Sequence, residues 1–135
     1  MKSIKFIAVI LFTLLVSHPG FSQKKNNIKP PKLMAVKFHA DWCKVCRAMG
    51  PVFEDLQNKM DGSDVLFIKL DFTNNQTKHQ ANLLGAELGL ADVLKQNYRR
   101  TGFVLVIDAK TKKVLKKLTV NDDVYSMETK IRALL

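Results

Sequence analysis

The 135-residue sequence has few cysteines and prolines, no internal repeat and no apolar run long enough to span a bilayer. Its two cysteines are too few for a small domain held together by several disulfides. The absence of a collagen-like repeat and the 47% apolar content exclude a fibrous or largely disordered chain. The composition is that of an ordinary globular protein, and a chain of this length forms one domain.

Residues 1–22 have the pattern of a secretory signal. Lys2 and Lys5 precede an apolar run over residues 6–16, and small residues stand shortly before Gln23. The run is much shorter than the ~20 residues that cross a bilayer as a helix, which favours a cleaved signal over a membrane anchor. No cysteine follows the run, so a lipid-attached start is not indicated. We expect an exported protein that has no stable membrane insertion after cleavage.

The net charge of +10 overstates the charge of the folded part. Two lysines fall in the signal, and four lie in residues 23–32, a polar stretch with almost nothing to bury. The remaining residues 33–135 hold 16 basic and 12 acidic side chains, a net charge of +4. This mild excess does not indicate nucleic-acid binding. We therefore expect a flexible basic arm at residues 23–32 and a folded domain at residues 33–135.

Hydrophobic periodicity predicts the elements of the domain. Apolar runs typical of strands occupy residues 33–40, 65–70, 103–107 and 114–120, the last two forming a hairpin. Steps of three and four predict helices after residue 44, between residues 77 and 98 with a break near Leu90, and from Asn121 or Asp122 to the end. The middle helical region should bury Leu83, Leu84, Leu88, Val93 and Leu94.

The predicted order is βαβαββα. Strands joined through helices should be parallel, and the final hairpin antiparallel. The sequence therefore predicts an α/β fold in which a four-stranded mixed sheet carries helices on both faces.

Cys43 and Cys46 lie between the first predicted strand and the first predicted helix. The free N–H groups and the dipole of a helix N-terminus favour an anion, so the thiolate of Cys43 should be stabilised there. Lys44 and Arg47 add positive charge with the same effect. Cys46 is one turn along the helix, where it can attack a mixed disulfide formed at Cys43. This placement indicates redox chemistry.

Other uses of the cysteine pair find less support in the sequence. It has no second Cys-x-x-Cys or Cys-x-x-His pair to complete a zinc site, and Arg47 stands where haem attachment needs a histidine. A purely structural disulfide over so short a loop would stabilise little. His39 or His79 could be metal ligands only if the fold brings them together. We predict no metal and no bound cofactor, and keep as an alternative a binding or carrier module, for copper or an assembly partner, with the two thiols as ligands.

Residues 38–47 (FHADWCKVCR), with Pro51, resemble the thioredoxin active-site block. The resemblance extends over about residues 33–135 and implies a thioredoxin-like fold. It also implies a thiol–disulfide oxidoreductase in which Cys43 is the attacking nucleophile and Cys46 the resolving cysteine. The segment Ala40-Asp41-Trp42-Cys43 further resembles soluble domains of bacterial envelope thiol–disulfide interchange proteins. With the signal, this implies a periplasmic or secreted reductase of disulfide-containing proteins, itself reduced by a membrane thiol–disulfide reductase.

Three positions depart from the thioredoxin pattern. Lys44-Val45 replaces the usual Gly-Pro pair and should change the reduction potential. Lys37 stands where the family has a buried Asp that helps proton transfer from the second thiol. A buried lysine is costly unless it is paired, for which Asp71 is a candidate, or reaches solvent. We expect Lys37, together with Trp42, Lys44 and Val45, to tune the site, with Trp42 shielding the site or belonging to the core.

The third departure is the loop before the third strand, which has Thr101-Gly102 in place of the family's cis-proline. A cis bond costs about 2.5–4 kcal/mol without proline, so we expect a trans peptide. This loop normally pairs with the substrate backbone, and an extra helical turn at about residues 91–98 is inserted before it. Thr101 and Gly102 are therefore the predicted substrate-contacting residues.

Overall fold

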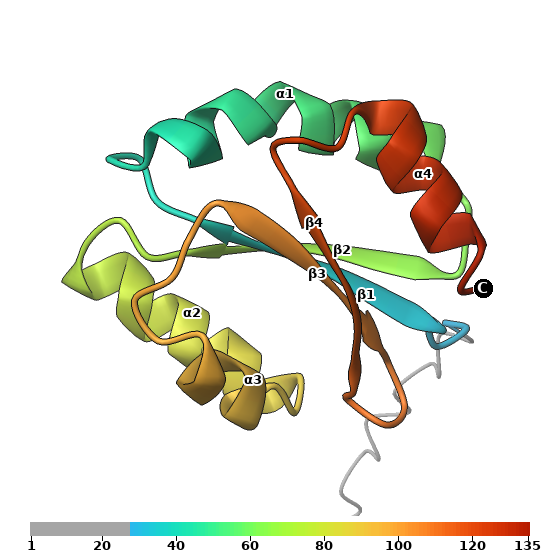
Figure 1. The fold of residues 1–135 in the computed structure, drawn as a ribbon. Helices are drawn as coiled ribbons and strands as arrows, with labels where there is room; N and C mark the ends of the chain where they lie inside the picture. Colours follow the sequence, from blue (N-terminus) through green and yellow to red (C-terminus); the bar gives the residue numbers. More distant parts are fainter. Residues whose placement is uncertain (1–27) are drawn as a thin grey trace, which may run out of the picture.

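The computed structural model describes residues 28–135. The elements follow the chain in the order β1 (Leu33–His39), α1 (Lys44–Lys59), β2 (Val65–Asp71), α2 (Asn75–Glu87), α3 (Ala91–Gln96), β3 (Phe103–Asp108), β4 (Val114–Thr119) and α4 (Val124–Arg132). The strands form a sheet of order β2-β1-β3-β4, with α1 and α4 on one face and α2 and α3 on the other (Figure 1). The predicted α/β class, the four-stranded mixed sheet and the helices on both faces are confirmed. The extra helical segment is α3.

The direction of β3 differs from the prediction. β1 and β2 are parallel, and β3 and β4 are antiparallel, as expected. The sequence predicts that β2 and β3, which α2 and α3 connect, are parallel. However, β3 runs antiparallel to β1, and hence also to β2. The reason is that α2 leads the chain away from the end of β2, and α3 with the following loop leads it back (Figure 1). Because two helical segments return the chain to the edge that it left, the rule for a single helical crossover does not apply.

Two apolar layers hold the sheet between its helices. β1 is covered on both faces, which explains why it is almost continuously apolar. Alternate residues of a strand point to opposite faces. Leu33 and Ala35 belong to the cluster beneath α1 and α4, whereas Val36 and Phe38 belong to the cluster beneath α2 and α3. The same alternation places Lys37 on the face that α1 covers.

The buried face of α2 is not the one predicted from its leucines. Leu83 and Leu84 are 56% and 44% exposed, whereas Ala81 and Gly85 are buried. A β-carbon at Gly85 would lie 2.3 Å from Cδ1 of Leu94 in α3. Gly85 therefore leaves the space that Leu94 occupies, because a larger residue at position 85 would push the two helices apart. The predicted break near Leu90 is confirmed by the separate helices on either side of it.

Both ends of the described chain are tied to the domain. Lys29 and Lys32 form ion pairs with Asp64 at 2.8 and 3.7 Å. At the other end, Asp123 caps α4 by accepting a hydrogen bond from the Ser126 N–H, at the residue after the predicted cap.

The predicted signal and residues 23–27 of the arm lie outside the described residues, so the boundaries 1–22, 23–32 and 33–135 stay predictions. Among residues 28–135, no helix combines the length and apolarity needed to cross a membrane.

Candidate active site

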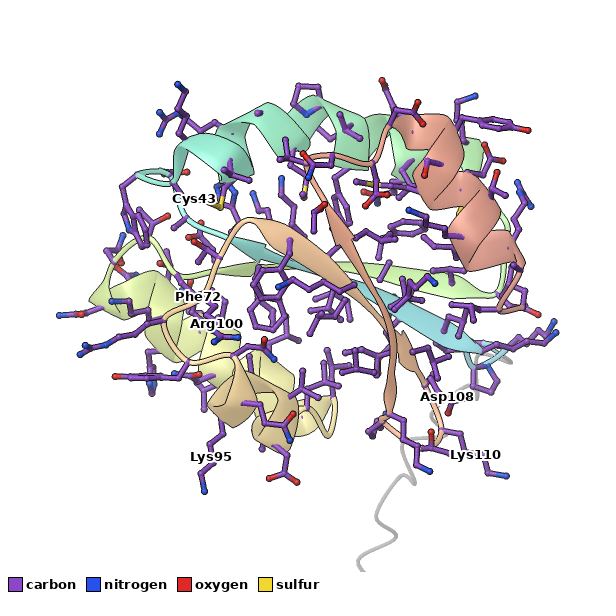
Figure 2. The ribbon with its side chains drawn as sticks, in the orientation of Figure 1. Cys43, Phe72, Lys95, Arg100, Asp108 and Lys110 are labelled. Carbon is purple, nitrogen blue, oxygen red and sulfur yellow. A yellow bond between two sulfur atoms is a disulfide. The ribbon has the colours of Figure 1, made fainter. Side chains whose placement is uncertain are left out.

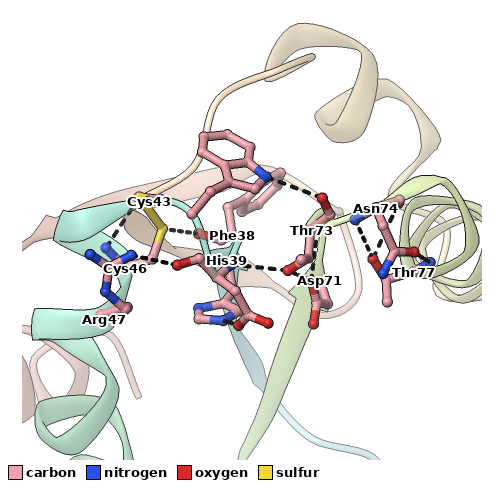
Figure 3. Close-up of polar contacts among 11 residues, drawn as sticks. Phe38, His39, Cys43, Cys46, Arg47, Asp71, Thr73, Asn74 and Thr77 are labelled. Atoms are coloured by element: carbon pink, nitrogen blue, oxygen red, sulfur yellow. Dashed lines mark hydrogen bonds and ion pairs between the residues drawn. A yellow bond between two sulfur atoms is a disulfide. The ribbon is translucent and has the colours of Figure 1, made fainter.

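The two cysteines lie at the junction of β1 and α1, where the sequence predicted them. Cys43 and Cys46 form a disulfide across the first turn of α1, with their Cα atoms 5.2 Å apart (Figure 3). Cys43 is half-buried, whereas Cys46 is fully buried beneath it. One sulfur is therefore accessible to another molecule and the other is accessible only to its partner, an asymmetry that suits sequential thiol exchange.

Cys43 is the N-cap residue of α1. Its backbone is extended, with φ −86° and ψ 111°, and its Sγ accepts a hydrogen bond from the Cys46 N–H at 3.2 Å. The first turn of the helix contains no acidic side chain. Lys44 and Val45, both exposed, occupy the first two helical positions between the cysteines. A negative charge on Cys43 in the reduced protein would therefore face an N–H donor and the positive end of the helix dipole.

Trp42 is held beside the disulfide rather than in the core. Its side chain is 62% exposed, and its indole N–H donates to the Thr73 carbonyl oxygen at 3.1 Å. The Thr73 hydroxyl in turn accepts from the Asp41 N–H at 2.9 Å. Thr73, which the sequence did not single out, thus connects the loop after β2 with the segment that carries the cysteines (Figure 3). The core role considered for Trp42 is excluded.

A second polar group lies beneath this loop. Nε2 of His39 is 2.9 Å from Asp41 Oδ1, and Asp71 Oδ1 accepts from the Thr73 N–H and hydroxyl at 2.8 and 2.6 Å. Burial raises the pKa of Asp71, but the two hydrogen bonds from Thr73, together with smaller effects of His39 and Lys69, leave the pKa below its usual value. Potential ligand atoms of His39, Asp41 and Asp71 lie within 4.8 Å of one another. The hydrogen bonds between His39 and Asp41 and between Thr73 and Asp71 account for the position of these three side chains. His79 is exposed on α2 and does not belong to the group.

The loop before β3 touches the accessible sulfur. The peptide bonds of the described residues include none in cis, as predicted for Thr101-Gly102. Gly102 has φ +88°, and a β-carbon there would lie 3.5 Å from Cys43 Sγ and 3.1 Å from Val45 Cγ1. The residue therefore needs both the backbone freedom and the small size of glycine.

One carbonyl oxygen links this loop to the buried sulfur. The Phe38 oxygen accepts from the Gly102 N–H at 2.9 Å and lies 3.7 Å from Cys46 Sγ. Neither the N–H nor the carbonyl of Thr101 has a hydrogen-bond partner among residues 28–135. Thr101 thus leaves its backbone N–H and carbonyl free next to Gly102, the residue of this loop that approaches Cys43 Sγ.

Lys37 is the buried charged residue on the other side of Cys46. It is 3% exposed, and its Nζ lies 5.6 Å from the ring centroid of Phe53. Lys37 and Cys46 line one cleft of about 410 Å³, together with Gly50 and Phe53 of α1. The lysine is thus buried, and it lines the same cleft as the Cys46 sulfur.

Lys37 does not form the ion pair with Asp71 that the sequence suggested as a candidate. Asp71 hydrogen-bonds to Thr73, and Lys37 has no carboxylate within 4 Å among the described residues. Burial lowers the pKa of Lys37 and the ammonium of Lys69 lowers it further, against a smaller opposite effect of Glu54. A buried amine without a carboxylate partner is poised to give up its proton more readily than a surface lysine.

The fold and the site together define a thioredoxin-like protein with a Cys-x-x-Cys disulfide at a helix N-terminus. The thioredoxin family model matches residues 14–84, more than half of the chain. The chain therefore belongs to the thioredoxin family.

Several known proteins are similar to parts of the chain. The thioredoxin of Ictalurus punctatus is 45% identical over 40 residues, which are 30% of this chain and 37% of that protein. Protein disulfide-isomerase 1 of Caenorhabditis elegans is 33% identical over 57 residues, 41% of this chain and 12% of that protein. The chain thus spans well under half the length of these curated relatives.

A solved structure supports the fold over a longer stretch. The solution structure of a candidate thiol–disulfide oxidoreductase from Bacteroides vulgatus covers 78% of this chain and 74% of its own, with a TM-score of 0.53. The two sequences are 19% identical, so the likeness extends to the fold alone.

Proposed function

We propose that the protein is an exported thiol–disulfide oxidoreductase that acts as a reductase of disulfide-containing proteins. The observation that carries the proposal is the disulfide across the first turn of α1, with Cys43 accessible and Cys46 buried beneath it. Family membership and the likeness to thioredoxins and to a protein disulfide-isomerase support the same chemistry.

In the first step, the Cys43 thiolate attacks one sulfur of a substrate disulfide. A bond forms between Cys43 and that sulfur, the substrate S–S bond breaks, and the other substrate sulfur leaves as a thiolate that takes up a proton. The Cys46 N–H and the N-terminus of α1 stabilise the attacking anion. The free backbone groups of Thr101 would pair with the substrate chain at this stage.

In the second step, Cys46 loses its proton and attacks the Cys43 sulfur. The mixed disulfide breaks, the second substrate sulfur leaves as a thiolate, and the Cys43–Cys46 disulfide forms. Two electrons have then passed from the dithiol to the substrate. Lys37 is proposed to assist the loss of the Cys46 proton, since it lines the same cleft.

The remaining parts of the proposal rest on the sequence. The pattern of residues 1–22 supports export to the periplasm or the medium of a bacterium, where disulfides persist. Repeated turnover then needs an external source of two electrons, for which we propose a membrane thiol–disulfide reductase. The mechanism uses no bound cofactor.

Reduction of insulin in the presence of dithiothreitol tests the proposed activity. The wild-type chain should accelerate the reduction, and Cys43→Ser should abolish the acceleration. Cys46→Ser is the matched variant, because it keeps the nucleophile but cannot resolve the mixed disulfide. An inactive wild type that binds Cu(I) stoichiometrically would instead identify the two thiols as ligands of a carrier and contradict the proposal.

Lys37→Ala tests the role of the lysine through the pH dependence of alkylation at Cys46. Lys69→Ala is the matched variant, since Lys69 lines the same cleft but is exposed. Other charged groups that face the cleft are His39, Arg47 and Glu54, and both variants leave them in place. We expect Lys37→Ala to shift the Cys46 profile by more than Lys69→Ala does. An unchanged profile would remove Lys37 from the mechanism.

A further inference from the structure

A groove of about 510 Å³ lies between the loop after β2, α2 and the loop after α3, and Trp42, the residue before Cys43, lines it. Tyr98, which is 72% exposed, is a second aromatic residue of its lining. Thr101 also lines the groove, and a β-carbon on the next residue, Gly102, would lie 3.5 Å from Cys43 Sγ. Two residues that line the groove, Trp42 and Thr101, are thus chain neighbours of Cys43 and Gly102, which bring it close to the accessible sulfur. Figure 2 shows Phe72 and Arg100 together at the same end of the molecule as Cys43.

The charges in this groove have one sign. Lys78, Arg99 and Arg100 line it, and no carboxylate does. None of the three cations forms an ion pair within 4 Å among residues 28–135. The Arg99 guanidinium instead lies 5.2 Å from the ring centroid of Tyr98, which stiffens one side of the groove.

The positions of the two arginines follow from the inserted helix. α3 and the turn after it place Tyr98, Arg99 and Arg100 in the same groove as Trp42, whereas Lys78 comes from α2. Arg99 has φ +61°, an uncommon conformation for a side-chain-bearing residue, and it directs the chain from α3 toward Gly102. Aromatic walls with unpaired cations at one end suit an extended chain that carries carboxylates.

We propose that this groove selects protein substrates that carry acidic side chains close to the disulfide to be reduced. The inference rests on the proposed function, because the bound segment would present its disulfide to Cys43. The occupant is an extended acidic segment of a disulfide-containing protein, and the unpaired cations carry the charge complementarity. Opposite charges lining a cleft raise the rate of association, and salt screens the effect.

Three peptide disulfides test the proposal. Each is the disulfide-linked dimer of a nine-residue peptide with a central cysteine. The three peptides differ only at four positions, two on each side of the cysteine, which are all glutamate, all glutamine or all lysine. The full chain is reduced, freed of reductant and mixed with each peptide. Trp42, the single tryptophan of the sequence, lies next to the disulfide, so its fluorescence reports the oxidation of Cys43 and Cys46.

At low salt we expect the glutamate peptide to react about tenfold faster than the glutamine peptide, and the lysine peptide to react more slowly than both. In 0.5 M sodium chloride the three rates should converge. The triple variant Lys78→Gln, Arg99→Gln and Arg100→Gln should lose the preference at low salt. All three residues are exposed, so the variant should fold. Its rate with neutral 2-hydroxyethyl disulfide should stay within twofold of wild type.

A matched triple variant separates the groove from the overall charge. Lys110→Gln, Lys113→Gln and Lys116→Gln remove the same charge from exposed positions on the β3–β4 hairpin. Lys110 lies at the end of the molecule opposite Cys43 (Figure 2). The hairpin variant should keep the preference for the glutamate peptide.

Equal rates for the three peptides at low salt, or equal losses of preference in the two triple variants, would overturn the groove proposal. A wild-type chain that reacts with 2-hydroxyethyl disulfide but shows no preference contradicts this inference alone. A wild-type chain that reacts with no disulfide contradicts the proposed function itself.

Discussion

Replacing Gly102 with alanine tests how the loop before β3 is built without a proline. The backbone at Gly102 has φ +88°, which costs a side-chain-bearing residue about 1–2 kcal/mol. The new β-carbon would also lie 3.1 Å from Val45 Cγ1 and 3.3 Å from Val45 Cβ. The side-chain and backbone shifts that such overpacking forces typically cost a further ~1–3 kcal/mol. Gly102→Ala should therefore lower the free energy of unfolding by about 2–5 kcal/mol.

Gly62→Ala isolates the backbone part of this effect. Gly62 has φ +73°, but a β-carbon there would meet no atom within 4 Å. Its replacement should cost only the backbone part, about 1–2 kcal/mol. Val45→Ala combined with Gly102→Ala should recover the part of the steric cost that comes from Val45 Cγ1, so the two substitutions should couple by about 1 kcal/mol.

The assay is urea denaturation of the oxidised protein at pH 7, followed by Trp42 fluorescence, for wild type and each variant. The loop would also move relative to Cys43 Sγ, so insulin reduction by Gly102→Ala should be slower than by Gly62→Ala. If Gly102→Ala cost no more than Gly62→Ala, or if Val45→Ala recovered nothing, the close contact of the loop with α1 would be refuted.

Three other substitutions give expected outcomes in the same denaturation assay. The folded-state pKa of Lys37 lies below its unfolded value near 10.4, so the protonated amine destabilises the fold at neutral pH. Lys37→Met should therefore stabilise the protein by about 1 kcal/mol at pH 7, and this gain should vanish as the pH rises toward 10–11; a loss of stability at pH 7 would contradict it. The Lys130 ammonium and the Thr119 N–H hold the pKa of Asp122 below its usual value. Asp122→Asn should cost about 1–2 kcal/mol at pH 7 and progressively less as the pH falls below about 4, and an equal cost at pH 3 would argue against the ion pair. Gly85→Ala should cost about 1–3 kcal/mol because Leu94 must move, and Leu94→Ala should reduce that cost if the α2–α3 contact is as described.

Much of the fold could be predicted because its signals are local. Short apolar runs bounded by turn residues identified the four strands, and apolar spacing identified α1 and α4. The direction of β3 could not be predicted, because it depends on where α2 and α3 return the chain. The prediction of the buried face of α2 was wrong for a related reason, since Gly85 contributes no hydrophobic signal although it is buried against Leu94 of α3.

The cysteine pair could be predicted for the same reason, since the strand before it and the helix after it are both visible in the sequence. The surroundings of the pair depend on tertiary contacts instead. Thr73 holds Trp42 from the loop after another strand, and Arg99 and Arg100 line one groove with Trp42 only when α3 folds back. The burial of Lys37 was undecided for lack of a local signal, because it follows from the face of β1 on which it lies.

The central claim is that Cys43 attacks the substrate and Cys46 resolves the product. The most direct measurement is to react reduced Cys46→Ser with a disulfide-containing protein substrate and locate the resulting cross-link by mass spectrometry of the digested complex. The account predicts a stable one-to-one mixed disulfide at Cys43, which the wild-type chain does not accumulate. It would be contradicted by the absence of a mixed disulfide at Cys43, or by one that forms equally well at Cys46 in the Cys43→Ser variant.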